Sequence, residues 1–117
     1  LYKFITDDHE VNNKTIIKVI VNKYDDVMYM SRLPLPFSNS DLVPNFKQQV
    51  PVYGFTKKAL DVFSKQRKTL NEQYEDSELL RFIDLGYKIK MQETTGDTIA
   101  VDVPSDIQKV ENFLNQH

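Results

Sequence analysis

The chain lacks cysteine, has only three glycines, and contains no long hydrophobic run. Without cysteine there is no disulfide framework, no thiolate nucleophile and no cysteine-ligated zinc site, and this composition suits a reducing compartment. The glycines do not form a phosphate-binding loop pattern. The longest apolar stretches, Ile16–Ile17 and Val19–Val21, are separated by Lys18 and are too short to cross a membrane. No signal-peptide pattern opens the chain, so the sequence predicts no membrane partner.

An excess of basic charge is also missing. The 15 Lys and Arg residues stand against 17 Asp and Glu residues, which gives a formal net charge of -2. Nucleic-acid binding needs clustered basic charge, so we expect no nucleic-acid partner. The pairs Lys57–Lys58 and Arg67–Lys68 are predicted to be solvated surface. With 117 residues the chain has room for one small domain or a large part of a bigger one, and because it begins at Leu1 we expect upstream sequence.

The first half of the chain predicts a β-hairpin. Residues 15–22 are short and rich in β-branched side chains, residues 22–26 have turn chemistry, and residues 27–30 resume the strand pattern. Residues 1–14, polar in their second part, are predicted to form a surface loop. Residues 33–36 contain two prolines and predict an extended segment that opens a loop reaching Pro44.

Strands and helices alternate in the second half. Residues 50–55 predict a strand, with Pro51 placing it at an edge or a strand end. Thr56 is the expected N-cap of a helix that buries three apolar residues, and Thr69 with Glu72 forms a capping box for a single longer helix ending before Gly86. The apolar residues expected to face inward are Ala59, Leu60 and Phe63 in the first helix and Leu79, Leu80, Phe82 and Ile83 in the second.

The last third predicts two strands and a closing helix. Residues 87–92 alternate with Ile89 and Met91 on one face, and residues 98–101 form a short strand. Pro104 suits the first position of a helix because its missing N–H is not needed there. The apolar stripe of that helix is Ile107, Val110, Phe113 and Leu114. The whole pattern predicts a mixed α/β fold.

Two single residues are candidates for binding charge. Arg32 follows the predicted hairpin and precedes Pro34 and Pro36, and its planar guanidinium suits a carboxylate or a phosphate. The alternative is an exposed arginine at a strand end. Asp102 lies between a predicted strand and a helix, where α/β sheets bind ligands and where a carboxylate suits Mg²⁺. The alternative is that Asp102 assists in capping the helix.

Acidic residues form two further groups. Glu72, Glu75 and Glu78 recur at spacing three and form a stripe along one helix side, which is most often a solvated face. Glu78 adjoins two leucines and is the one expected to turn inward. Residues 7–10 (DDHE) superficially resemble a metal cluster, but adjacent loop residues seldom converge on one ion, so we do not assign a metal there.

Three segments in the same order resemble the CMP-Kdo synthetase (3-deoxy-manno-octulosonate cytidylyltransferase) family. Residues 16–37 (IIKVIVNKYDDVMYMSRLPLPF) are similar to a strand, hairpin and arginine–proline segment of that family. Residues 71–91 (NEQYEDSELLRFIDLGYKIKM) resemble its helix and following strand, and residues 101–110 (VDVPSDIQKV) resemble its strand-to-helix motif. The resemblance covers residues 12–114, which is nearly the whole chain.

This resemblance implies an α/β fold, the C-terminal half of a nucleotide-diphospho-sugar transferase (Rossmann-like) fold with a β-hairpin dimerisation element. Residues 1–117 would be a single partial domain that lacks the N-terminal nucleotide-binding half. The implied protein is a cytoplasmic, Mg²⁺-dependent homodimer that transfers CMP from CTP to an acidic 2-keto-3-deoxy sugar, for lipopolysaccharide biosynthesis. The implied dimer contact is residues 16–36.

The resemblance also implies roles for individual residues. Asp102 corresponds to a magnesium ligand, Glu78 to a contact with sugar hydroxyls, and Arg32 to an arginine on the active-site side, our catalytic candidate. Gln49 stands where the family has a histidine, and Tyr53 is a further candidate for the sugar pocket. Gln49 and Tyr53 complete the predicted substrate-binding set.

Departures from the family pattern leave alternatives open. Gln49 replaces a histidine, Leu79 replaces a glutamine, and Val103 and Ser105 replace a threonine and a glutamate. A polar contact that is altered in this way changes sugar selectivity, so another acid sugar, such as a sialic-acid-like substrate, is one alternative. A non-catalytic binding or dimerisation module of the same fold is another. By itself, the chain is expected to be inactive, because the triphosphate-binding segment is absent.

Overall fold

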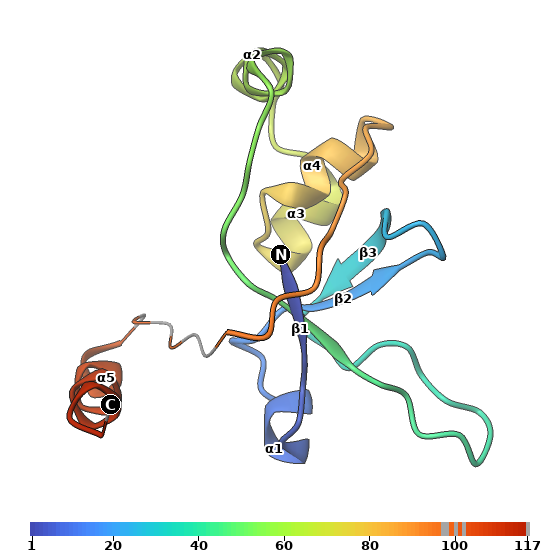
Figure 1. Ribbon diagram of the computed structural model, residues 1–117. Helices are drawn as coiled ribbons and strands as arrows, with labels where there is room; N and C mark the ends of the chain where they lie inside the picture. The colour runs from blue at the N-terminus through green and yellow to red at the C-terminus, as the bar shows by residue number, and fades with distance from the viewer. Residues whose placement is uncertain (97–98, 100, 102, 117) are drawn as a thin grey trace.

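The computed structural model describes residues 1–96, 99, 101 and 103–116 (Figure 1). In chain order the elements are β1 (Tyr2–Phe4), α1 (Asp8–Val11), β2 (Lys18–Val21), β3 (Val27–Ser31), β4 (Lys47–Gln49), α2 (Lys57–Lys65), α3 (Leu70–Glu75), α4 (Leu79–Asp84) and α5 (Pro104–Leu114). No helix within the described ranges is long and apolar enough to cross a membrane.

A four-stranded antiparallel sheet with the order β1-β4-β2-β3 forms the base of the fold. Strands β2 and β3 pair directly, which confirms the predicted hairpin. Its turn is built by Asn22, whose side-chain Oδ1 accepts hydrogen bonds from the backbone N–H groups of Tyr24 (2.9 Å) and Asp26 (3.1 Å). Asp25 takes a left-handed conformation with φ of 61°, which aspartate tolerates better than most residues.

The fourth strand is not where the sequence predicts it. The predicted strand at residues 50–55 is wrong, because β4 ends at Gln49 and the chain turns around Pro51. The backbone N–H of Val52 donates to the carbonyl of Val50 (2.7 Å), and Pro51 has no N–H for a ladder. The predicted loop at residues 1–14 is also wrong in part, since it contains β1 and the short helix α1.

Residues 87–94 form an extended segment that is tied to two strands in succession. Val27 N–H donates to the carbonyl of Ile89 (2.9 Å), and further on Tyr2 N–H donates to the carbonyl of Gln92 (2.9 Å). Because the segment changes partner after a few residues, it forms isolated bridges instead of the continuous strand predicted at 87–92. Of the strand predicted at 98–101, Thr98 and Ala100 lie outside the described residues.

The helices confirm the predicted caps but not the predicted continuity. Thr56 caps α2, its Oγ accepting from the backbone N–H of Ala59 (3.2 Å). The single helix predicted from residue 70 to 85 is two helices, α3 and α4, because Asp76 adopts the left-handed conformation with φ of 50°. Gly86, with φ of +80°, ends α4 as predicted.

The core lies between the sheet and α4, with α3 beside it and α2 farther from the sheet (Figure 1). It is built from the buried side chains of β1, β2, β3, α4 and the extended segment: Tyr2, Val19, Met30, Leu79, Leu80, Phe82 and Met91. Ile83 and Ile89 pack against this cluster, so the inward faces predicted for the second helix and for residues 87–92 are confirmed. In α2, Ala59 and Phe63 pack against the core but Leu60 is exposed.

The closing helix α5 begins with Pro104, as predicted. The backbone N–H of Val103 donates to the carboxylate of Asp106 (3.1 Å), which is the backward half of a capping box. In Figure 1, α5 lies apart from the sheet and from the other helices. The predicted burial of its stripe is therefore wrong for Ile107 and Leu114, which are more than half exposed.

Candidate functional site

Three predicted substrate-binding residues come together in the structure. Gln49 at the end of β4 and Tyr53 four residues later are joined by a hydrogen bond from the Gln49 amide to the Tyr53 hydroxyl. Burial raises the pKa of Tyr53, and the negative charge of nearby Glu78 raises it further, while the Gln49 hydrogen bond opposes both. The turn at Pro51 brings Tyr53 towards Glu78, although the two are 25 positions apart in the sequence.

Next to these residues lies a cavity of ≈ 300 Å³ between residues 53–55, α2 and the start of α4. We call it the aromatic pocket, and its lining is Tyr53, Phe55, Leu60, Phe63, Glu78, Leu79 and Phe82. Phe82 lies at the centre of an aromatic wall: its ring stacks on Phe55 (centroids 5.6 Å apart) and on Phe63 (5.5 Å). The sequence predicts Phe63 and Phe82 only as core residues. The helical spacing of an aromatic side chain does not indicate whether that side chain also borders a cavity.

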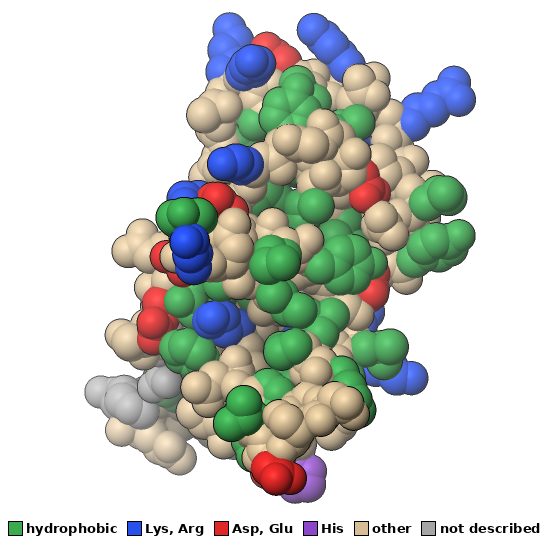
Figure 2. Space-filling view, turned by 90° about the vertical axis from the view of Figure 1, so that its right-hand side faces the viewer, with side chains coloured by type: hydrophobic (Ala, Val, Ile, Leu, Met, Phe, Trp, Pro, Cys, Tyr) green, Lys and Arg blue, Asp and Glu red, His purple; other side chains and the backbone are tan. Residues whose placement is uncertain are grey.

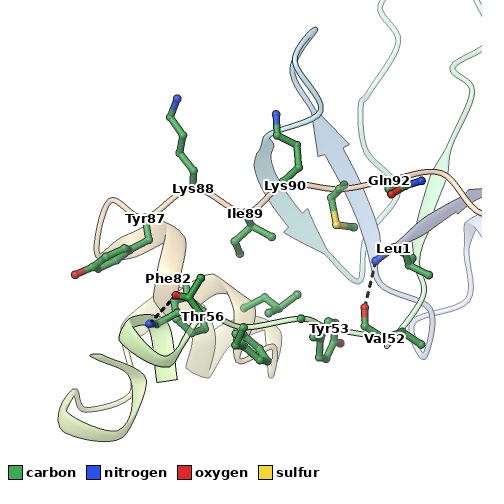
Figure 3. Close-up of a pocket in the computed structure, with 15 residues that line it drawn as sticks. Leu1, Val52, Tyr53, Thr56, Phe82, Tyr87, Lys88, Ile89, Lys90 and Gln92 are labelled. Atoms are coloured by element: carbon green, nitrogen blue, oxygen red, sulfur yellow. Dashed lines mark hydrogen bonds between the residues drawn. The ribbon is translucent and has the colours of Figure 1, made fainter. Parts of the chain in front are cut away.

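A second cavity, of ≈ 430 Å³, shares the lining residues Tyr53, Phe55, Leu79 and Phe82 with the aromatic pocket. Residues 87–92 form its opposite side (Figure 3). Ile89 points into the space between residues 53–56 and residues 87–92, whereas Lys88 and Lys90 point away from it. Lys90 instead pairs with Asp26 (2.9 Å) at the hairpin turn. These two lysines therefore direct their charge away from the cavity, whose lining mixes apolar side chains with the polar side chains of Thr56, Tyr87 and Gln92.

The acidic stripe is arranged differently from the prediction. Glu72, not Glu78, turns inward: its side chain is 2% exposed and forms two hydrogen bonds with Arg81, at 2.7 Å to Nε and 2.6 Å to Nη2. Glu78 is exposed at the rim of the aromatic pocket. The prediction that Glu78 turns inward is wrong because a buried carboxylate needs a cationic partner, and Arg81 lies opposite Glu72.

Arg32 makes contacts with backbone. Its guanidinium donates to the carbonyls of Glu75 (2.8 Å), Lys14 (3.0 Å) and Asp76 (3.2 Å). The backbone N–H of Arg32 donates to the carboxylate of Glu75 (2.9 Å). These contacts tie the end of β3 to the end of α3. They are contacts of a structural residue, and the catalytic role implied by the family resemblance stays a prediction.

Metal ligation by Asp102 also stays a prediction, because Asp102 lies outside the described residues. Within the part of the chain that the structure describes, no group of three or more His, Asp or Glu side chains could hold a metal ion. The acidic run at residues 7–10 has a local role instead. Asp7 caps α1, its carboxylate accepting from the backbone N–H of His9 (2.9 Å).

The fold resembles a solved nucleotide-using synthetase. The structure of CMP:2-keto-3-deoxy-manno-octonic acid synthetase complexed with CTP superposes with a TM-score of 0.90 and 27% sequence identity, over 98% of this chain and 47% of that chain. The chain thus has the fold of a class of proteins: it is similar to about half of a CMP:2-keto-3-deoxy-manno-octonic acid synthetase.

The relatives by sequence name the particular family. The 3-deoxy-manno-octulosonate cytidylyltransferase of Flavobacterium johnsoniae is 34% identical over 116 residues, covering 97% of this chain and 47% of the relative. The relative from Chloroherpeton thalassium is 34% identical and covers 94% of this chain and 46% of its own length. The relative from Nitratiruptor sp. is 35% identical and covers 93% of this chain and 45% of its own length. No family model matches the chain.

The chain spans about half the length of the curated relatives that it matches. The family resemblance stated from the three sequence segments is confirmed, and the chain is homologous to the C-terminal half of CMP-Kdo synthetases.

Proposed function

We propose that the protein containing this chain is a cytidylyltransferase, which transfers CMP from CTP to an acidic 2-keto-3-deoxy sugar such as Kdo and releases pyrophosphate. This chain would be the sugar-binding and dimerisation half of a nucleotide-diphospho-sugar transferase (Rossmann-like) fold. The observation that carries the proposal is that Tyr53, which accepts a hydrogen bond from Gln49, lines one cavity together with Glu78, in a chain homologous to CMP-Kdo synthetases. A cytoplasmic location and a part in lipopolysaccharide biosynthesis follow from the same homology.

In this proposal the polar residues orient the sugar. The exposed carboxylate of Glu78 accepts hydrogen bonds from sugar hydroxyls, and a hydrogen bond to a charged group is among the stronger ones. Tyr53, whose hydroxyl accepts a hydrogen bond from the Gln49 amide, lines the same cavity. The chemical step is attack of the anomeric hydroxyl of the sugar on the α-phosphorus of CTP: the new O–P bond forms as the bond to pyrophosphate breaks, and the hydroxyl loses its proton.

Magnesium belongs to the proposal through the family resemblance, with Asp102 as the ligand from this chain. When bound, the ion would neutralise charge on the triphosphate. The family resemblance implies that this chain would supply only one ligand, Asp102, to the ion.

A second candidate is a non-catalytic binding or dimerisation module of the same fold. One observation favours it: the nitrogens of the Arg32 side chain already donate to three backbone carbonyls, so this guanidinium is committed to the fold. An arginine used in this way does not supply an anion-binding fork.

The deciding experiment measures pyrophosphate release by the intact protein with CTP, Mg²⁺ and a panel of 2-keto sugar acids. We expect release that requires both Mg²⁺ and a sugar acid. In Glu78→Gln the KM for the sugar acid should rise about 10- to 100-fold, the loss of a charged hydrogen bond, with the KM for CTP unchanged. The matched control is Glu111→Gln on the exposed side of α5, which should alter neither constant. Absence of release across the whole panel would favour the non-catalytic module.

A further inference from the structure

Gln49 and Tyr53 share a hydrogen bond, but the backbone holds them to different degrees. Gln49 ends β4, where its N–H donates to the carbonyl of Ile17 (2.8 Å) and where it pairs in register with Tyr2 of β1. Tyr53 lies in the irregular segment after the turn at Pro51, and within the described part of the chain its own N–H and carbonyl make no backbone hydrogen bond. The sheet therefore fixes Gln49, and the Gln49 amide locates the Tyr53 hydroxyl.

The direction of this hydrogen bond decides what Tyr53 offers to a ligand. The Nε2 group of Gln49 donates to the hydroxyl oxygen of Tyr53. A phenol has one proton and can accept as well as donate, so a hydroxyl that accepts from Gln49 keeps its proton for another partner. Among the described residues, no acceptor for that proton is found. The Tyr53 hydroxyl is therefore an unused donor beside the aromatic pocket.

The charge of Glu78 favours the same direction. Its carboxylate is close enough to Tyr53 to raise the pKa of the hydroxyl, and both side chains line the aromatic pocket. A negative charge attracts the hydroxyl proton, which leaves the oxygen lone pairs of Tyr53 to the Gln49 amide. Tyr53 is 43% exposed and Glu78 is exposed as well, so a ligand can reach both groups. The pocket thus offers a ligand one donor, Tyr53, and one acceptor, Glu78.

We propose that Gln49 is a positioning residue whose amide fixes the Tyr53 hydroxyl as a hydrogen-bond donor to the sugar acid, while Glu78 accepts from the same ligand. The proposal rests on the proposed function and gives Gln49 a role that needs no contact with the substrate. A sugar hydroxyl both donates and accepts, which suits this combination of groups. Without the Gln49 amide, Tyr53 is no longer held before the ligand arrives, and its ordering then opposes binding.

The first test is a double-mutant cycle on the intact protein, in which pyrophosphate release is measured with CTP, Mg²⁺ and Kdo. Gln49→Met keeps the length of the side chain and removes the donor. It should raise the KM for Kdo about 3- to 10-fold, the loss of one neutral hydrogen bond, and leave the KM for CTP unchanged. Tyr53→Phe should have a similar effect. In the Tyr53→Phe background, Gln49→Met should cause no further rise, because the group on which it acts is already absent.

The matched control is Gln48→Met, the same chemical change one residue earlier on β4, where alternation places the side chain on the other face of the sheet. Gln48 does not line the aromatic pocket, so this variant should alter neither KM. If Gln49→Met raises the KM for Kdo equally with and without the Tyr53 hydroxyl, Gln49 acts by itself; that result overturns the inference and leaves the proposed function standing. Absence of turnover would count against the proposed function, and the next measurement would still decide the inference.

The pKa of Tyr53 reports the direction of the bond and does not need turnover. An N–H donor from Gln49 stabilises the phenolate and lowers the pKa of Tyr53, whereas an amide oxygen that accepts from Tyr53 would stabilise the neutral phenol. Gln49→Met should therefore raise the pKa of Tyr53, measured by NMR titration of tyrosine labelled with ¹³C at Cζ, with Tyr53→Phe to assign the resonance. A pKa that falls or stays the same in Gln49→Met would refute the proposal, whatever the activity of the protein.

Discussion

Glu72 and Arg81 show how a single pair of residues fixes the arrangement of three helices. Both are buried, and their two hydrogen bonds join α3 to α4, while Arg81 also binds the carbonyls at the end of α2. Removing two charges from water is costly, and the pair is stable because each of the three guanidinium nitrogens of Arg81 donates to an acceptor. The ion pair also contacts the aromatic wall, because Cζ of Arg81 lies 3.8 Å from the centre of the Phe63 ring.

The first prediction concerns the loss of one partner. Arg81→Met should lower the free energy of unfolding by about 3–5 kcal/mol, because the carboxylate of Glu72 then stays buried without a cation. The double variant Glu72→Leu with Arg81→Met should recover a substantial part of that loss, because no uncompensated charge remains. Urea denaturation of all three proteins at neutral pH measures both effects. A loss below about 1 kcal/mol in Arg81→Met would show that the pair does not stabilise the fold.

The same pair has a pH dependence of known sign. The hydrogen bonds from Arg81 lower the pKa of Glu72 below the ordinary value, and burial only partly opposes them. Stability from Glu72 is therefore fully present above the pKa of the unfolded carboxyl, about 4.3, and is lost as the pH falls through the lower folded value. Glu72→Gln should remove this part of the acid dependence, so its unfolding free energy should change less than that of the unmodified protein below about pH 4.

At the scale of the elements, the break between α3 and α4 is the feature that presents Glu78 at the pocket. Asp76 is left-handed, and its carbonyl and that of Glu75 accept hydrogen bonds from Arg32. Arg32 is more than 40 positions away in the sequence and satisfies carbonyls that the end of a helix leaves free. The start of α4, and with it Glu78, is thus set by contact with β3.

A third prediction tests this break. Asp76→Gly should leave the unfolding free energy unchanged or raise it slightly, because glycine adopts positive φ without strain. Asp76→Val should lower it by about 1–2 kcal/mol, the cost of a left-handed conformation for a residue with a Cβ. The order should reverse at Asp61 inside α2, where glycine is the worse helix former. The same order at both positions, measured by urea denaturation, would mean that the φ of Asp76 does not limit stability.

Local signals could be predicted from the sequence, and contacts between distant segments could not. The hairpin, the Thr56 cap and the stop at Gly86 depend on neighbouring residues and are found as predicted. The helix break was missed because aspartate is compatible with both helical and left-handed backbone, and Arg32 decides between them. The strand at 50–55 was predicted from its β-rich composition, but the turn at Pro51 takes these residues out of the sheet.

The same distinction applies to the candidate site. Gln49, Tyr53 and Glu78 were chosen by likeness to a family, and the structure brings them together, which tests their proximity and not their role. Among three equally spaced glutamates, the sequence offered no means of telling which one Arg81 would meet. Phe55 lies in neither a predicted helix face nor a predicted site, yet it borders both cavities.

At the scale of the whole molecule, the end formed by α2 exposes basic side chains, whereas the hairpin and the loop after it expose hydrophobic ones. Lys and Arg side chains project at the top of Figure 2, where α2 lies, and the paired residues Lys57–Lys58 and Arg67–Lys68 are exposed as predicted. Hydrophobic side chains appear over the middle of the same face (Figure 2). The hairpin and the following loop expose Tyr24, Met28, Leu33, Phe37, Leu42 and Val43. Exposed apolar side chains are frequent in protein interfaces, and Tyr24, Met28 and Leu33 lie within residues 16–36, the proposed homodimer contact.

The last prediction follows from that surface. If residues 16–36 form the contact between two copies, Leu33→Gln should weaken self-association of the intact protein about tenfold, because an amide then replaces a hydrocarbon side chain between the copies. Leu33 is 61% exposed, so the substitution should leave the unfolding free energy of the monomer nearly unchanged. Analytical ultracentrifugation over a range of concentrations measures the dimer dissociation constant directly.

The control for this experiment is Leu70→Gln, which makes the same chemical change at a similar exposure (66%) at the start of α3, outside residues 16–36. It should leave the dimer dissociation constant unchanged, so that a difference between the two variants reports the position and not the added polarity. If both variants dissociate at the same concentration as the unmodified protein, the hairpin is not the contact. The apolar side chains of β3 and its loop would then need a different partner, because their exposure to water in a free monomer is unfavourable.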